Sequence, residues 1–156
     1  MRTLTVFYDA DCGVCTRFRR WMVKEPAYVE LIFLPYDSRR ALELVPSLPE
    51  RGADREIVVM ADDGRLWQGA GAWVTCLWTL RRWRKWARRL ASPALLPLAA
   101  KVCGLVSANR LSLSRLLHLE SDREVVGAVE RMEVDCTDDR CRFERAKSLA
   151  RGREER

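Results

Sequence analysis

The sequence predicts an α/β fold with additional helices at its C-terminal end, and three observations support this class. Short apolar segments of strand length alternate with amphipathic helical segments, an Asp-Asp-Gly turn joins the last two strands, and helical periodicity continues beyond them. The predicted order is β-α-β-α-β-β-α, followed by further helices. Because 156 residues can form one full hydrophobic core, we expect one domain over residues 1–120. Residues 121–156 are expected to form a short helix and a charged tail.

Four segments are predicted in the first third of the chain. Residues 3–8 are rich in β-branched and aromatic side chains and end at a turn, which indicates a strand. A helix that stops at Pro26 is predicted from apolar residues at helical spacing, namely Val14, Phe18, Trp21 and Met22. Residues 28–34 form a nearly continuous apolar run, typical of a parallel strand that is buried on both faces. Ser38 can cap a short helix through Val45.

A hairpin and a long helical region are predicted next. Residues 57–60 and 65–68 read as antiparallel strands, because Asp62-Asp63-Gly64 between them is a hairpin signal. Helical periodicity begins at Ala70 and continues, with Trp73, Leu77, Leu80 and Ala87 on one stripe. Residues 94–106 are apolar nearly all round, so we expect a second, buried helix there.

The C-terminal region carries a helix-start signal and then a charged segment. Ser121 and Glu124 have the spacing of a capping box, which predicts a short helix through Met132. Residues 142–156 are highly charged with few apolar anchors, so we expect a solvated helix or a disordered end.

The formal net charge is +6, and the positive charge is concentrated in one region. Between Gly64 and Leu119 there are ten Lys and Arg residues and no Asp or Glu. Such a region favours anionic partners, whether lipid headgroups, acidic proteins or nucleic acid. The tryptophan-rich helix expected there is a candidate for binding an anionic surface through Arg81, Arg82, Lys85 and Arg89. No nucleic-acid-binding module is recognised, so specific nucleic-acid binding is not expected.

The N-terminal residues and the apolar segments bear on localisation. The N-terminus lacks the apolar core and cleavage site of a secretory signal. The longest charge-free stretch, residues 90–100, contains two prolines and is shorter than the roughly 20 residues that a membrane span needs. We therefore expect a cytoplasmic protein without a transmembrane helix. In a reducing cytoplasm its six cysteines are expected to be thiols, metal ligands or transient redox partners.

The pair Cys12-Gly-Val-Cys15 lies between a predicted strand and a predicted helix, and this context indicates redox chemistry. A thiol at the first turn of a helix is near unpaired backbone N–H groups and the positive end of the helix dipole, which stabilise the thiolate. We therefore expect Cys12 to attack a disulfide of the client and Cys15 to resolve the mixed disulfide, with no bound cofactor.

Two aspartates flank this pair. Asp11 is expected to be the N-cap of the helix. Asp9, three residues before Cys12, is expected either to accept or relay a proton during exchange or to stabilise the turn.

The segment Asp9-Ala-Asp-Cys-Gly-Val-Cys15 resembles the Asp-x-x-Cys-x-x-Cys signature of the DCC family of predicted thiol-disulfide oxidoreductases. Two other elements are similar to those of the family, a hairpin followed by small residues and an Asn-Arg element. Here they are Asp63-Gly64-Arg65 with Gly69-Ala70, and Ala108-Asn109-Arg110. The resemblance covers about residues 4–119.

The resemblance implies a thioredoxin-like fold and a partner that is a disulfide-containing or dithiol client protein, or a small thiol. It also implies that Asp9, Cys12 and Cys15 carry the activity, with Asn109 and Arg110 in structural or substrate-facing supporting roles. Thioredoxins have a cis-proline before their third strand, whereas residues 54–56 are Asp-Arg-Glu here. We therefore expect a client to dock on this protein in a different way from its docking on a thioredoxin.

The alternative interpretation is a noncatalytic, zinc-stabilised module. Its metal ligands would be Cys12, Cys15, Cys136 and Cys141, and its basic tryptophan-rich helix would bind an acidic partner or a membrane surface. Cys136 and Cys141 are otherwise expected to form a reversible disulfide of their own, to accept electrons from the first pair, or to be indifferent surface thiols. Cys76 and Cys103 are expected to be small buried hydrophobes, and His118 a packed or surface residue.

Overall fold

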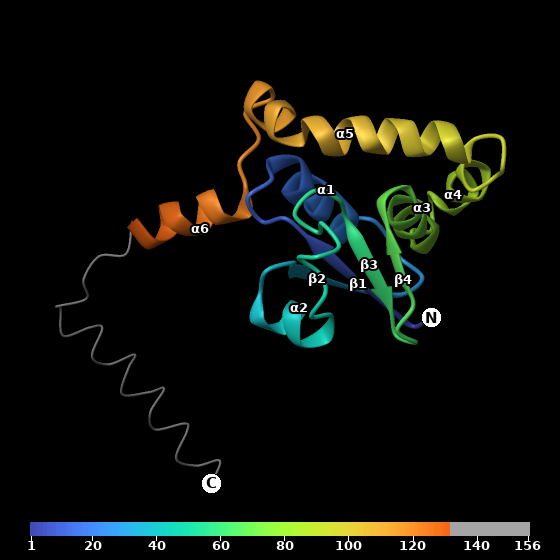
Figure 1. Cartoon of the computed structure of the whole chain (residues 1–156), viewed down its shortest axis with the longest axis horizontal. Coiled ribbons are helices and arrows are strands. Elements are labelled where there is room, and N and C mark those ends of the chain that lie inside the picture. The colour runs from blue at the N-terminus through green and yellow to red at the C-terminus, as the bar shows by residue number, and fades with distance from the viewer. Residues whose placement is uncertain (132–156) are drawn as a thin grey trace, which may run out of the picture. The chain divides into compact units, whose positions relative to one another are not determined.

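The computed structural model describes residues 1–131. The chain divides into two compact units, Met1–Val125 and Val126–Arg156. The first unit contains the sheet, helices α1 to α5 and the start of α6 (Figure 1). The charged segment predicted over residues 142–156 lies outside the described residues.

A four-stranded mixed sheet in the order β2-β1-β3-β4 forms the centre of the fold. Strands β1 and β2 are parallel, whereas β1 with β3 and β3 with β4 are antiparallel. Their bounds are Thr3–Tyr8 for β1, Glu30–Pro35 for β2, Val58–Ala61 for β3 and Leu66–Gln68 for β4. The predicted α/β class, consistent with a thioredoxin-like fold, is confirmed.

Six helices accompany the sheet within the described residues. They are α1 (Gly13–Lys24), α2 (Arg39–Leu44), α3 (Gly69–Thr79), α4 (Arg84–Leu90), α5 (Leu96–Leu116) and α6 (Asp122–Arg131). Two predicted caps are present. The Ser38 hydroxyl accepts the Ala41 N–H at the start of α2, and Ser121 and Glu124 each bind the other's backbone N–H at the start of α6.

The hydrophobic core occupies both faces of the sheet, because successive side chains of a strand point to opposite faces. On one face, Leu4 and Val6 of β1 lie with Met22 of α1 and with residues of α3. On the other face, Phe7 packs with α2 and the segment that comes after it. Helix α5 then lies over α1 and α3, on the side of the sheet away from α2 (Figure 1).

Two expectations about the strands and the long helix are corrected by this arrangement. Strand β2 is parallel, as predicted, but only partly buried, because it is an edge strand of the sheet. The helix predicted to continue from Ala70 breaks after Thr79. Leu80 adopts an extended backbone and pairs with Ala27 in an isolated bridge, which buries its side chain completely.

The expectation that residues 94–106 form a buried helix is wrong. Helix α5 continues to Leu116, and Leu98, Val102 and Leu105 are each more than half exposed. Only the inward face of α5 contacts the domain, since no described element covers its outer face. Over residues 1–131, no helix combines the length and apolar character that crossing a membrane requires.

Gly13, the first residue of α1, allows a close approach between that helix and the turn after α5. A Cβ at this position would lie 2.8 Å from the Cβ of Leu119 and would overlap its backbone oxygen. The turn at Leu119 therefore lies directly against the start of α1, where the dithiol is located.

We predict that Gly13→Ala destabilises the protein by about 1 to 3 kcal/mol, because the added methyl group overpacks this contact. The matched control is Gly104→Ala in α5, whose added Cβ meets no atom within 4 Å. It should raise stability by about 0.5 to 1 kcal/mol through higher helix propensity. Urea unfolding of both variants measures the difference, and equal stability of the two would contradict the prediction.

Candidate active site

The turn between β1 and α1 positions both cysteines. The Asp9 carbonyl accepts the Cys12 N–H at 3.3 Å, and the Asp9 carboxylate accepts the Asp11 N–H at 2.9 Å. Cys12 is itself the N-cap of α1, and its Sγ accepts the Cys15 N–H at 3.3 Å. The expectation that Asp11 caps the helix is therefore wrong. Its carboxylate is exposed and binds Arg123 instead, because the turn places Cys12, one residue later, at the cap.

The same turn sets the ionisation of the two thiols. The hydrogen bond from the Cys15 thiol is the largest contribution that lowers the pKa of Cys12, to about 7. The Cys15 N–H and the Arg110 charge also lower this pKa, whereas burial and Asp9 oppose them. The same thiol contact, followed by burial, raises the pKa of Cys15. Cys12 therefore carries the thiolate near neutral pH, and Cys15 carries the proton.

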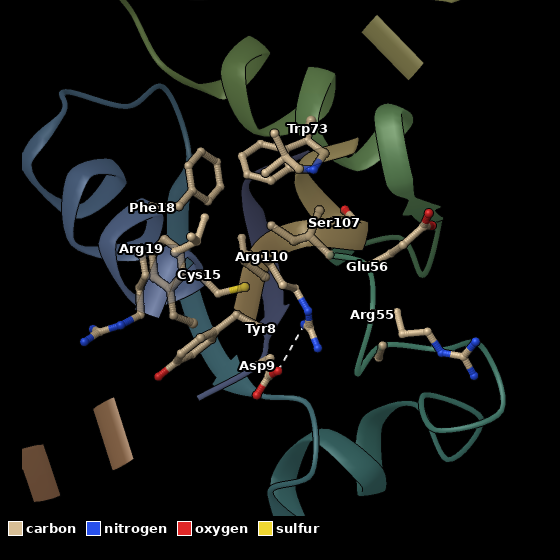
Figure 2. A pocket seen from close by; sticks show the side chains of 16 residues that line it. Tyr8, Asp9, Cys15, Phe18, Arg19, Arg55, Glu56, Trp73, Ser107 and Arg110 are labelled. Carbon is tan, nitrogen blue, oxygen red and sulfur yellow. Dashed lines mark ion pairs between the residues drawn. The ribbon is translucent and has the colours of Figure 1, made fainter. Parts of the chain in front are cut away.

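The two sulfurs differ in access as well as in charge. Cys12 has no exposed surface, whereas Cys15 is partly exposed and lines a pocket. Figure 2 shows the Cys15 side chain pointing toward the interior of this pocket, with Phe18 and Trp73 on one side and Arg110 opposite. A molecule in the pocket thus meets Cys15, whereas Cys12 is buried and is not part of the lining.

The pocket has a largely apolar wall. Its apolar lining comes from α1, the sheet, α3 and α5, and includes Val14, Phe18, Phe33, Ile57, Trp73 and Val106. The indole Nε1 of Trp73 is buried and has no hydrogen-bond partner among the described residues. The pocket can therefore accept an apolar group that also carries a hydrogen-bond acceptor.

A buried ion pair lines the pocket that contains Cys15. The Arg110 guanidinium of α5 lies 3.0 Å from the Asp9 carboxylate, and both side chains are largely buried (Figure 2). The structure thus brings together Asp9 and Arg110, which are far apart in the sequence. Asn109 does not join them, because its side chain is exposed and donates to the Leu105 carbonyl within α5.

Comparison with known protein families agrees with this geometry. Residues 6–116 match the family model of the DCC1-like thiol-disulfide oxidoreductases, which covers more than half of the chain. The chain belongs to the DCC1-like thiol-disulfide oxidoreductase family. The resemblance carried by the cysteine signature is thereby confirmed. No curated protein and no solved structure matches the chain.

Two residues of this DCC1-like chain that support the site were not identified from the sequence. The Ser114 hydroxyl of α5 accepts the Val14 N–H at 3.1 Å and donates to the Arg110 carbonyl at 2.7 Å. It thereby satisfies a free N–H in the first turn of α1. Serines near the end of an apolar helix carry no sequence signal for this role, because the contact joins segments 100 residues apart.

The second residue is Asp122, at the start of α6. Its carboxylate accepts bonds from the Tyr8 hydroxyl at 2.9 Å and from two nitrogens of Arg19 at 2.9 and 3.0 Å. Burial opposes its ionisation, but the bonds from Arg19 and Tyr8 outweigh burial and hold the pKa of Asp122 below its usual range. Burial, followed by the bond to Asp122, raises the pKa of Tyr8 to about 12. Asp122 thus ties the segment after α5 to β1 and α1.

The remaining cysteines and the histidine lie apart from this site where the structure describes them. Cys76 is fully buried, and burial raises its pKa to about 12, so it is an unreactive core residue. Cys103 is partly buried, and its pKa is raised chiefly by burial. His118 is exposed. Within residues 1–131, no three His, Cys, Asp or Glu side chains lie close enough together to hold a metal ion. Cys136 and Cys141, the other two ligands of the zinc interpretation, lie outside the described residues.

We predict that Arg110→Ala raises the pKa of Cys12 and that Asp9→Asn lowers it, because the two charges act on the thiolate with opposite sign. The thiolate fraction of Cys12 at pH 7 should therefore fall in Arg110→Ala and rise in Asp9→Asn. The pH dependence of iodoacetamide alkylation measures this pKa, with a midpoint near 7 in the wild type.

Both variants break the same buried ion pair, so both lose stability for the same reason. If loss of stability alone changed the alkylation midpoint, the midpoint would move in the same direction in both variants. Midpoints that move in the same direction would contradict the electrostatic assignment.

Proposed function

We propose that the protein is a thiol-disulfide oxidoreductase in which Cys12 and Cys15 alternate between a dithiol and an internal disulfide. The observation that carries this proposal is the Cys12 sulfur at the N-cap of α1, which accepts the Cys15 N–H and has a pKa near 7. A thiolate at neutral pH is the reactive form in disulfide exchange. Family membership supports the same chemistry in general.

The proposed reaction has two exchange steps. The Cys12 thiolate attacks one sulfur of a client disulfide, forms a mixed disulfide and releases the other client sulfur as a thiolate, which takes up a proton. Cys15 then loses its proton and attacks the Cys12 sulfur, which forms the Cys12–Cys15 disulfide and releases the second client thiol. Two electrons pass from the protein to the client, and exchange itself needs no cofactor.

Cys12 is favoured as the attacking sulfur because its pKa is the lower of the two, whereas Cys15 is the sulfur that is accessible from the pocket. We assign the attack to Cys12, because the protonated Cys15 is a poor nucleophile until its proton is removed. Because Cys12 has no exposed surface, this attack requires the Cys15 side chain or the turn at Leu119, which packs tightly against the start of α1, to move aside.

Asp9 is proposed to accept the Cys15 proton during the second step. Asp9 and Cys15 line the same pocket, and the Arg110 ion pair keeps the carboxylate next to the dithiol. The proposed clients are disulfide-containing or dithiol proteins, or small thiols. We also propose that the reaction takes place in the cytoplasm, where the prevailing potential favours its reductant direction.

We predict that Cys12→Ala abolishes reduction of a fluorescent disulfide-bridged peptide, because the attacking thiolate is lost. Cys15→Ala should instead accumulate a mixed disulfide between Cys12 and the peptide, since no resolving thiol is present. Non-reducing electrophoresis and intact mass measure the adduct, and Cys76→Ala, which removes an unreactive buried thiol, is the control. Adducts with Cys12→Ala but not with Cys15→Ala would reverse the assigned roles.

The zinc content of the protein and its response to a chelator distinguish this function from the zinc-stabilised alternative. We predict that the reduced protein holds less than one zinc per ten chains and that treatment with a chelator leaves peptide reduction unchanged, because the thiols act unliganded. Elemental analysis and the peptide assay measure both. Stoichiometric zinc that is lost in Cys136→Ser or Cys12→Ser would support the alternative.

A further inference from the structure

The segment from α4 to the middle of α5 exposes many large apolar side chains. Those exposed by more than a third are Trp83, Trp86, Leu95, Leu96, Leu98, Val102 and Leu105. Leu98, Val102 and Leu105 succeed one another at helical spacing and therefore lie on one face of α5. A single exposed leucine is ordinary, but seven large apolar side chains within 23 residues mark a binding surface. We call these residues, with the cations among them, the α4–α5 surface.

The charges of this surface all have one sign. The exposed cations among its apolar residues are Lys85, Arg88, Arg89 and Lys101, and Arg82 lies just before them. No Asp or Glu occurs between Gly64 and Leu119, so no carboxylate of this segment neutralises them. A partner of this surface must therefore offer both apolar contact and negative charge.

We propose that the α4–α5 surface docks on an anionic lipid bilayer and lies flat in its headgroup layer. Leu98, Val102 and Leu105 would enter the boundary of the acyl chains, and the lysines and arginines would bind lipid phosphates. Each cation near an anionic bilayer strengthens binding about fivefold, and a few apolar side chains add a second, independent contribution. Neither contribution requires a membrane-spanning helix.

One arginine of the surface stacks on one of its aromatic rings, which favours a bilayer as the occupant. The Arg89 guanidinium lies 5.3 Å from the ring centre of Trp86, and both side chains are exposed. Tryptophan and arginine are both favoured at a membrane–water interface, because each has an apolar body and a polar end.

A second copy of the chain is a poorer occupant of the same surface. In a two-fold dimer each patch meets its own equivalent, so the cations of one protomer would face those of the other. The bilayer removes this repulsion because its charge has the opposite sign.

The α4–α5 surface and the dithiol pocket use different residues of α5, on different faces of the helix. Val106, Ser107 and Arg110 point inward and line the pocket, whereas Leu98, Val102 and Leu105 face away from the domain. Figure 1 shows α5 on the outer side of α1 and α3, with α4 next to its N-terminal end. Docking through the outer face leaves the pocket lining unchanged, so the proposal does not depend on the proposed redox function.

Cosedimentation of the full chain with phosphatidylglycerol vesicles tests the proposal, with phosphatidylcholine vesicles as the neutral comparison. We expect binding to the anionic vesicles alone, with a blue shift of tryptophan fluorescence. Leu98→Ser with Leu105→Ser should weaken binding at least tenfold, and so should Lys85→Glu with Arg88→Glu. Reduction of a soluble disulfide peptide should be unchanged in both double variants.

Matched double variants on other surfaces control for hydrophobicity and charge. Val23→Ser with Leu44→Ser replaces two similarly exposed apolar residues, and Arg39→Glu with Arg40→Glu makes the same change in net charge on α2. Both should retain binding. Absence of binding to anionic vesicles, or equal losses in the control variants, would overturn the proposal. Vesicle-independent self-association lost in Leu98→Ser with Leu105→Ser would assign the surface to a second copy instead.

Discussion

The backbone N–H groups at the start of α1 are the constraint on which the site depends. A helix begins with N–H groups that lack intrahelical partners, and a buried helix start needs other acceptors for them. Here the Cys12 sulfur accepts one from Cys15, and the Ser114 hydroxyl accepts one from Val14. The N–H bond from Cys15 is one of the contributions that lower the pKa of Cys12, after the larger one from the Cys15 thiol. The bond that caps the helix therefore also favours the thiolate form of Cys12.

The segment from α5 to the start of α6 completes this site from outside the sheet. Arg110 pairs with Asp9, and Asp122 binds Tyr8 and Arg19. These contacts join β1 and α1 to residues about 100 positions later in the chain. A dithiol motif of four residues thus depends on a distant helix for its electrostatic environment, and the family match over residues 6–116 includes that helix.

Helix α5 has different tasks on its two faces. Its inward residues line the pocket and form the ion pair, and this face is fixed by packing against α1 and α3. Its outward residues have no described element against them and remain apolar and cationic. One helix thus lines the pocket of the dithiol with one face and leaves another face apolar and exposed.

The sequence by itself determined the order of the strands and of the helices as far as α3, the Ser38 and Ser121 caps, and the location of Cys12 and Cys15 at the start of a helix. These features are local, because they depend on side-chain periodicity, turn residues and spacing within a few positions. Only the tertiary structure decided that Leu80 leaves the helix, that α5 is exposed rather than buried, and that Arg110, Ser114 and Asp122 surround the dithiol. The physical reason is that burial and long-range pairing depend on which elements meet in space, and an apolar sequence does not specify which of its faces will be covered.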